Sequence, residues 1–145
     1  MPVPADINPR IVEALYGEAL VLADALRGRF GGDFGAGGEA VAQVALACEG
    51  LRATTRTMHC LAWLLNHRAY FAGEISEFQL RRHGRLPAAT ASDNPALLPL
   101  EAAQLVRLSE RLFARVERLE KAWRGEGTEI RPSAVERLRE RLAAG

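Results

Sequence analysis

The sequence predicts an all-α protein: an antiparallel three-helix bundle with a long central helix and short accessory helices. Apolar residues recur at three- and four-residue steps in three long stretches, which is the spacing of one face of a helix. Clusters of glycine and proline separate these stretches, as expected for connections between helices. No stretch shows a strand pattern that competes with this reading. Helices joined in this way bury their apolar faces against one another.

The first helix is expected to begin at Pro9 and to end near Phe30. Asn8 is a good N-cap, and proline suits the first helical position. Gly31 and Gly32 end the helix, and a glycine-rich connection follows over residues 31–38. The expected buried stripe consists of Ile11, Leu15, Ala19, Leu22, Leu26 and Phe30.

The central helix is expected over residues 39–72, with Gly73 as its stop. One of its apolar stripes follows a seven-residue repeat, which is typical of a helix packed lengthwise against others. We therefore expect this stripe to be buried; it consists of Val41, Val44, Cys48, Leu51, Thr55, Met58, Ala62, Leu65, Ala69 and Ala72.

A second stripe in the same helix includes Thr57, Leu61, Leu64 and Phe71, with Trp63 beside it. The central helix would span roughly 50 Å against roughly 33 Å for the first helix, so the first helix cannot cover all of it. Three candidates to cover Trp63, Leu64 and Phe71 are a short accessory helix, the far end of the third helix, and a second copy of the chain. Because symmetric dimers are the commonest oligomers, we hypothesise a homodimer through this region.

The C-terminal half continues the helical pattern. Ser76 can cap a short helix that ends at His83, and a loop with three prolines leads to a third helix over residues 100–124. The expected stripe of the third helix is Leu105, Leu108, Leu112, Val116, Leu119 and Trp123. Gly125 and Gly127 then interrupt the pattern, which divides the chain into a bundle domain (1–124) and a flexible or short-helical tail (125–145).

The composition narrows the class of protein. With 145 residues the chain is one domain, and 48% hydrophobic residues provide a core without metals or disulfides. A net charge of +1 gives no general attraction to nucleic acid or membranes. Strictly apolar runs such as residues 61–65 are too short to span a bilayer, and no signal-peptide pattern opens the chain. Cys48 and Cys60 lie too far apart on one helix for a disulfide. Together these features predict a cytoplasmic protein.

No catalytic, metal or cofactor site is predicted. The glycine-rich run GGDFGAGG lacks the Lys-Ser/Thr of a phosphate-binding loop and follows a helix instead of a strand. No nucleophile elbow or paired carboxylates in a cleft are evident. His59 and His67 are eight residues apart, so their side chains do not converge on one ion. We therefore expect that the protein is not an enzyme.

The densest basic segment, Arg81 to Arg85, is the first choice for a partner contact through Arg81, Arg82 and Arg85. The alternative is a solvated helix end, where cations are favourable. For Arg52 and Arg56 we favour a structural interpretation: long stems cover the helix and guanidinium groups pair with acids such as Glu18 or Asp24.

The tail carries one weak apolar stripe. It consists of Val135, Leu138 and Leu142. Such a segment is marginal alone and can fold on a partner. It can equally pack on its own bundle, and the sequence leaves both alternatives open.

Within the central helix, residues 49–77 carry a recognisable pattern. The elements are Gly50 to Met58 (GLRATTRTM), Ala62 to Leu65 (AWLL), Arg68-Ala69 and Gly73 to Ser76 (GEIS). With this spacing the chain resembles the RcdA family, the regulators of CtrA degradation in alphaproteobacteria. The resemblance continues weakly through residues 18–24.

The resemblance implies a dimeric three-helix bundle with a mobile C-terminal segment and no catalytic activity. Members of the RcdA family act as adaptors in proteolysis by ClpXP. They help to present the cell-cycle regulator CtrA, together with the response regulator CpdR and the cyclic-di-GMP receptor PopA, at the cell pole. By this resemblance the expected partners are a ClpXP-linked response regulator, a cyclic-di-GMP receptor protein and a CtrA-like client.

Two other classes of function stay open. One is a DNA-associated regulator that uses Arg81, Arg82, Arg85 and the arginines of the third helix on phosphates. Acidic residues interleave with those arginines, which is more typical of a salt-bridged solvent face than of a DNA-reading helix. The other is a purely structural homo-oligomer.

Overall fold

The computed structural model describes residues 7–31, 39–89, 91–93, 95–125 and 134–144. These ranges contain five α-helices and one 3-10 turn, and no strand lies within them. The all-α bundle predicted from the sequence is confirmed. The elements are α1 (Pro9–Phe30), α2 (Ala40–Phe71), α3 (Glu77–His83), η1 (Pro95–Leu97), α4 (Leu100–Arg124) and α5 (Ala134–Ala144).

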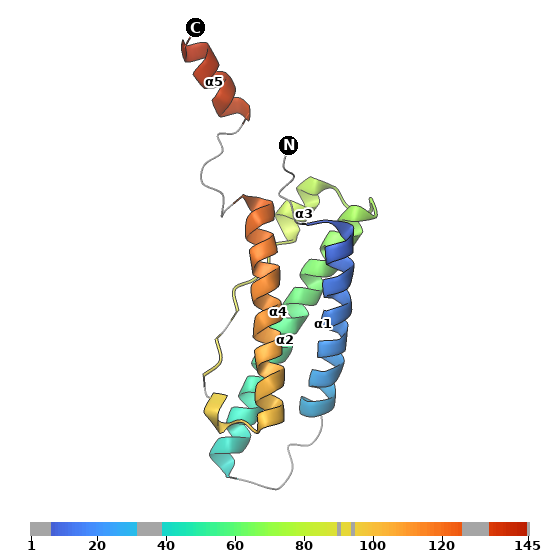
Figure 1. Cartoon of the computed structure of the whole chain (residues 1–145), viewed down its shortest axis with the longest axis vertical. Helices are drawn as coiled ribbons and strands as arrows, with labels where there is room; N and C mark the ends of the chain where they lie inside the picture. The colour runs from blue at the N-terminus through green and yellow to red at the C-terminus, as the bar shows by residue number, and fades with distance from the viewer. Residues whose placement is uncertain (1–6, 32–38, 90, 94, 126–133, 145) are drawn as a thin grey trace.

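The three long helices α1, α2 and α4 form the bundle. α5 lies beyond the C-terminal end of α4, away from the bundle (Figure 1). α1 runs antiparallel to both neighbours, as the contacts Glu13–Arg68 and Glu18–Arg115 show. α2 and α4 run parallel, because Arg56 contacts Ser109 and Trp63 contacts Glu120. Three helices cannot all be antiparallel to one another, so one pair in such a bundle is parallel, and here that pair is α2 and α4. The reason is that α3 and a long extended connection return the chain to the starting end of α2 before α4 begins (Figure 1).

Local signals set the helix ends. The Asn8 side chain accepts from the Ile11 amide, and Ser76 forms a capping box with Gln79. Gly73 follows the C-cap of α2, and Gly125 is the C-cap of α4. They adopt positive φ angles of 79° and 74°, which glycine tolerates. The sequence located each of these signals correctly. Part of the glycine-rich connection and the start of the predicted last helix lie outside the described residues.

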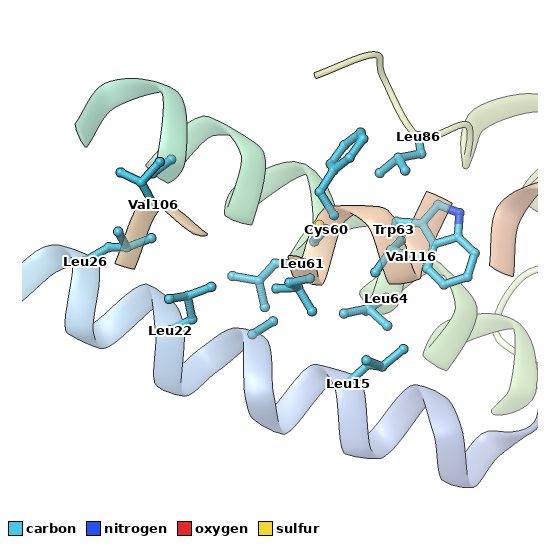
Figure 2. Packing of buried hydrophobic residues seen from close by; sticks show 14 of the residues in the cluster. Leu15, Leu22, Leu26, Cys60, Leu61, Trp63, Leu64, Leu86, Val106 and Val116 are labelled. Atoms are coloured by element: carbon cyan, nitrogen blue, oxygen red, sulfur yellow. The ribbon is translucent and has the colours of Figure 1, made fainter. Parts of the chain in front are cut away.

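The core lies between the three long helices (Figure 2). From α1 it receives Leu15, Leu22 and Leu26, as the sequence predicts, and Leu86 reaches it from the connection after α3. The other labelled members are Cys60, Leu61, Trp63, Leu64, Val106 and Val116. Phe30 packs so closely on Gly50 that a Cβ there would lie 2.4 Å from the ring. A glycine is thus required where α1 meets α2.

The prediction for the buried stripe of α2 is wrong. The seven-residue repeat is exposed, and the helix instead buries Ala45, Gly50, Ala53, Thr57, Cys60, Leu61, Trp63 and Leu64, together with the polar Glu49, Arg56 and His67. The three polar residues interrupt the buried stripe in the sequence, so the uninterrupted apolar repeat looked more like a core face. Contacts with other elements make their burial possible.

The far end of α4 covers Trp63, which was one of the three candidates. The Trp63 indole donates a hydrogen bond to Glu120, at 2.9 Å. Trp63 is 2% exposed and Leu64 is fully buried within one chain, so neither can contact a second copy. Phe71 is 37% exposed and is the member of the trio that stays accessible.

The predicted stripe of α4 is rotated from the observed one. Leu112 and Val116 are buried as expected, but Leu108 is exposed and Leu105, Leu119 and Trp123 are half-buried. The helix buries Ala102, Val106, Ser109, Phe113 and Glu120 in their place. Ser109 and Glu120 receive Arg56 and Trp63 of α2, and these cross-helix bonds select the buried face.

Candidate protein-interaction surfaces

A row of exposed apolar side chains runs along α2. We call it the α2 stripe; it consists of Val41, Val44, Cys48, Leu51, Met58 and Leu65. Its five large side chains are between 46% and 69% exposed. Single exposed apolar residues are ordinary, but a continuous row of them along one helix is typical of a protein-binding surface.

Hollows flank the α2 stripe on both sides. One, of about 450 Å³, lies between α2 and the connection to α4 and includes Val44, Cys48, Arg52, Asp93 and Leu97. The other, of about 620 Å³, lies between α1 and α2 and is lined mainly by apolar atoms, including those of Leu26, Phe30 and Met58. A row of projecting side chains with a hollow on each side is the shape into which another helix packs.

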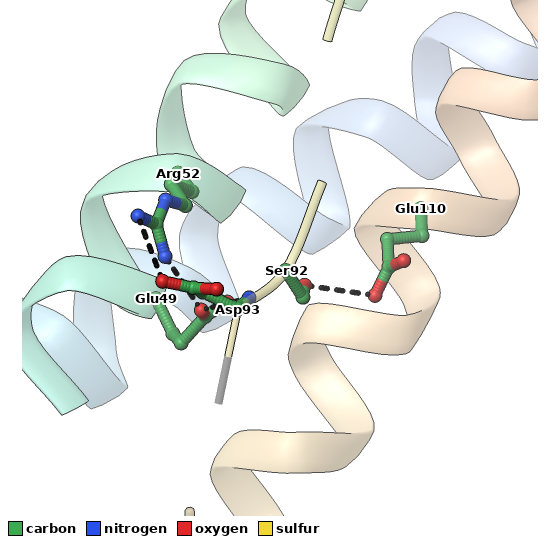
Figure 3. Close-up of polar contacts among 5 residues, drawn as sticks. All are labelled: Glu49, Arg52, Ser92, Asp93 and Glu110. Atoms are coloured by element: carbon green, nitrogen blue, oxygen red, sulfur yellow. Dashed lines mark hydrogen bonds and ion pairs between the residues drawn. The ribbon is translucent and has the colours of Figure 1, made fainter. Parts of the chain in front are cut away.

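A polar network holds the connection between α3 and α4 against the bundle (Figure 3). The buried Glu49 carboxylate accepts from the Asp93 amide and from Arg52, both at 2.8 Å. Ser92 donates to Glu110 of α4 at 3.1 Å. The connection is thereby tied to α2 at one residue and to α4 at its neighbour, and it forms one wall of the first hollow.

A second network closes the opposite end of the bundle. Besides the Trp63 indole, Glu120 accepts from the Leu86 amide at 2.6 Å. His67 lies against Trp63, with 3.8 Å between ring centroids, and edge-on to Trp123 at 5.2 Å. Neither nitrogen of the buried His67 ring has a hydrogen-bond partner in the described structure. Burial, aided by the nearby positive charge of Arg124, lowers the pKa of His67 to about 4, so the ring is neutral at pH 7.

Within the basic segment, Arg81 differs from Arg82 and Arg85 because it packs against α4. The Arg81 guanidinium pairs with Glu77 at 3.1 Å and stacks on Trp123, 4.3 Å from the ring centroid. Much of its side chain thus supports the contact between α3 and α4. Arg82 and Arg85 are exposed beside it.

Arg52 and Arg56 have the structural role expected for them, but with other partners than Glu18 and Asp24. Arg52 pairs with Glu49, and the buried Arg56 donates to Ser109 at 2.7 Å. On α4, Arg115 pairs with Glu18 and Arg124 with Glu120. These basic side chains are thus engaged within the chain, which does not favour a phosphate-binding face.

The tail residues are exposed where the structure describes them. Leu138 is 57% and Leu142 is 75% exposed. Val135 belongs to α5, but its side chain lies outside the described part of the chain. Both side chains are thus accessible, and their role as partner contacts stays a prediction.

Reactive groups are scarce among the described residues. Burial raises the pKa of the Cys60 thiol to about 12, although the charge of Arg56 acts in the opposite direction, so it is no nucleophile at pH 7. The described residues hold no group of three or more His, Cys, Asp or Glu suited to a metal ion. Among them, too, no helix has the length and apolarity needed to cross a membrane.

The sequence did not identify Glu49 and Glu120, the two carboxylates that organise both networks. A signal was available, because each is an acid at a helical position that is otherwise spaced for burial. This signal could not identify the hydrogen-bond partners of the two carboxylates, because the amides of Asp93 and Leu86 belong to an irregular connection.

Comparison with known proteins agrees with this fold. The profile of a family described as "Protein of unknown function (DUF1465)" matches residues 4–145. None of the curated proteins matches the chain.

The crystal structure of RcdA from Caulobacter crescentus CB15 superposes with a TM-score of 0.65 at 24% sequence identity. The alignment covers 85% of this chain and 97% of the RcdA chain. The resemblance to RcdA first seen in the central helix is thus confirmed at the level of the fold.

Proposed function

The chain belongs to the DUF1465 family, and from that premise we propose that it is a non-enzymatic adaptor in regulated proteolysis. In this role it helps to deliver a cell-cycle transcription regulator, similar to CtrA, to the ClpXP protease. The observation that carries the proposal is the RcdA-like fold across most of the chain. The division into a bundle (1–124) and a tail (125–145) is part of the same proposal.

The character of the surface supports an adaptor more than an enzyme. An adaptor needs surfaces that hold two proteins at once. The chain has an exposed apolar α2 stripe, exposed arginines at the C-terminal end of α3 and a tail helix with exposed leucines. The polar side chains that are buried are mostly engaged in joining elements, as Glu49, Arg56 and Glu120 are.

We assign the α2 stripe to a second copy of the chain. In a parallel or antiparallel pair of α2 helices, the five large side chains would enter the hollows beside the partner's stripe. The homodimer hypothesised from the sequence is kept, but its face moves from Trp63 and Leu64, which are enclosed, to this stripe. Phe71 lies at the accessible end of the same helix.

We assign the contacts with protease-linked partners and client to two other surfaces. Arg82 and Arg85 offer positive charge to acidic partners, and Arg81 contributes the exposed part of its side chain. The tail contributes Leu138 and Leu142, with Val135 as the third member of the stripe. The partners expected are a ClpXP-linked response regulator, a cyclic-di-GMP receptor protein and the client regulator.

A crosslinking pulldown with the tagged full-length protein from its native cells tests the proposal. Recovery of ClpX, a CpdR-like response regulator or CtrA supports the adaptor. Recovery of the chain alone, or of DNA-associated proteins that are lost after nuclease treatment, contradicts it.

The variant Arg82→Glu/Arg85→Glu should lose protein partners in this pulldown while the bundle stays folded. Arg10→Glu/Arg107→Glu, at two exposed arginines on α1 and α4, is the control with the same change of charge. Equal recovery with both variants would remove the basic segment from the proposal.

A further inference from the structure

A second apolar groove runs between α1 and α4. Its larger part, about 570 Å³, includes Val21 and Leu22 of α1 and Leu105, Leu108 and Leu112 of α4. A further hollow of about 400 Å³ continues along the same two helices past Ala25 and Gly28. Val21 is 72% and Leu108 is 48% exposed.

The α1 wall of this groove is low because its residues are small. Gly17, Ala25 and Gly28 line it, and a Cβ added at Gly17 or Gly28 would meet nothing within 4 Å. The floor is apolar, and the rim carries the ion pair of Arg115 with Glu18 and the exposed Arg111. A helix with a narrow apolar stripe can therefore approach closely.

The chain contains such a helix. α5 has 11 residues and lies apart from the bundle in Figure 1, with Leu138 and Leu142 exposed. An isolated helix of this length is marginal in water, because nucleation is costly and packing supplies most helical stability. The α5 sequence thus needs a surface on which to bury its leucines.

We propose that α5 docks into the α1/α4 groove of its own chain, antiparallel to α4. Nine residues separate Arg124 from Ala134, and a chain of that length reaches at most about 30 Å. Leu112 and Leu108 lie about 18 Å and 24 Å below Arg124 along the helix. The groove is within reach of the tail.

The spacing of the leucines fits this position. Leu138 and Leu142 are four residues apart and share one face of α5, and the exposed Leu108 and the half-buried Leu105 form the α4 wall of the groove, so both leucines of α5 can pack against this wall. Val21 of α1 completes the opposite wall. Arg139 and Arg141 flank the apolar stripe of α5, and Glu18 and Glu101 lie among the residues that line the groove.

The tail therefore has two positions, one docked and one extended as in Figure 1. Docking covers Leu138 and Leu142 and makes them unavailable to another protein. This inference concerns the chain alone and does not depend on the proposed adaptor role, so either can fail without the other.

Disulfide trapping in the full chain tests the docked position. In a Cys48→Ser background, Val21→Cys is combined with Arg139→Cys or with Arg141→Cys, one on each flank of the stripe. The matched control replaces Val21→Cys by Leu20→Cys, which is also exposed on α1 but does not line the groove. Cys60 is buried and is left in place. Circular dichroism checks that each variant keeps its helices.

One of the two Val21→Cys pairs should form an intramolecular disulfide roughly ten-fold or more faster than both Leu20→Cys pairs, because docking holds the thiols at a high effective concentration. Equal rates for positions 20 and 21 would overturn the proposal. A disulfide that links two chains would also overturn it, because the occupant of the groove would then be the tail of a second copy.

A second measurement avoids new thiols. In the full chain, Leu138→Glu/Leu142→Glu should change the backbone amide chemical shifts of Val21 and Leu108, whereas the shift of Leu65 on the α2 stripe should not change. Unchanged shifts at Val21 and Leu108 contradict docking.

Discussion

At the scale of single residues, buried polar groups determine how the helices align. Glu120 accepts from the Trp63 indole and the Leu86 amide, and the buried Arg56 reaches Ser109 across the bundle. A buried donor or acceptor without a partner costs about 1–3 kcal/mol. A sliding of α4 along α2 would break these bonds together, so they favour one alignment.

Gly50 makes the most sharply defined steric prediction. Gly50→Ala places a Cβ 2.4 Å from the Phe30 ring, so the ring must move out of its site in the core. We expect the free energy of unfolding to fall by about 1–3 kcal/mol, as overpacking usually costs. Urea denaturation measures the change.

Gly17→Ala is the matched control. Gly17 is also inside a helix, but a Cβ there meets nothing within 4 Å. This substitution should raise the unfolding free energy by about 0.5–1 kcal/mol, because alanine favours helix more than glycine does. Equal effects of the two substitutions would mean that Phe30 does not pack on Gly50.

His67 gives the protein a dependence of stability on pH. Its pKa is lowered from 6.5 to about 4 in the folded chain, so between these values the unfolded chain binds more protons than the folded one. Stability due to the neutral ring is fully present above pH 6.5 and is lost as the pH falls toward 4. His67→Phe should flatten the curve of unfolding free energy against pH in this window. The variant is compared with the unmodified chain by urea denaturation, and an unchanged slope would contradict the burial of a neutral histidine.

At the scale of the elements, the sequence predicted the helices better than their buried faces. Asn8, Ser76, Gly73 and Gly125 end helices through local chemistry, which a sequence contains in full. α1 has one apolar stripe, and that stripe is the buried one. α2 has two, and the choice between them depends on which polar residues find partners in other elements. Those partners are far apart in the sequence, so periodicity could not select the face.

The connection between α3 and α4 is an element whose position depends on one carboxylate. Glu49→Ala removes the acceptor of the Asp93 amide. Hydrogen exchange at Asp93 should then become roughly ten-fold or more faster, as a lost bond of about 1.5 kcal/mol implies. Glu110→Ala, which removes only the exposed bond to Ser92, should change this exchange little. Slow exchange at Asp93 in Glu49→Ala would show that other contacts hold the connection.

At the scale of the whole molecule, the apolar α2 stripe predicts self-association. Leu51→Glu should convert a dimer to a monomer in sedimentation equilibrium, because it buries a charge at the middle of the proposed interface. Leu100→Glu, at the start of α4, is a control of similar exposure, 72% against 69%, outside both the stripe and the α1/α4 groove. The stripe would be excluded as the dimer face if the unmodified chain is monomeric at micromolar concentration. It would also be excluded if the Leu51→Glu variant is still a dimer.

The role proposed for the protein rests on resemblance and not on the chemistry of its residues. The Thr-Thr-Arg and Trp-Leu-Leu elements of α2 pointed to RcdA, yet Trp63 and Arg56 prove to hold the bundle together. The pattern that revealed the fold is therefore largely structural. Residues that touch partners lie on exposed surfaces, where packing within the chain places few demands on the sequence.

A reconstituted degradation assay tests the adaptor role most directly. Purified ClpXP, a CpdR-like response regulator and a CtrA-like client are combined with and without this protein, and the loss of client is followed over time. An adaptor accelerates the degradation of the client and loses this effect in Arg82→Glu/Arg85→Glu. Degradation at the same rate with and without the protein, under conditions in which the client is cleaved, would contradict the adaptor role.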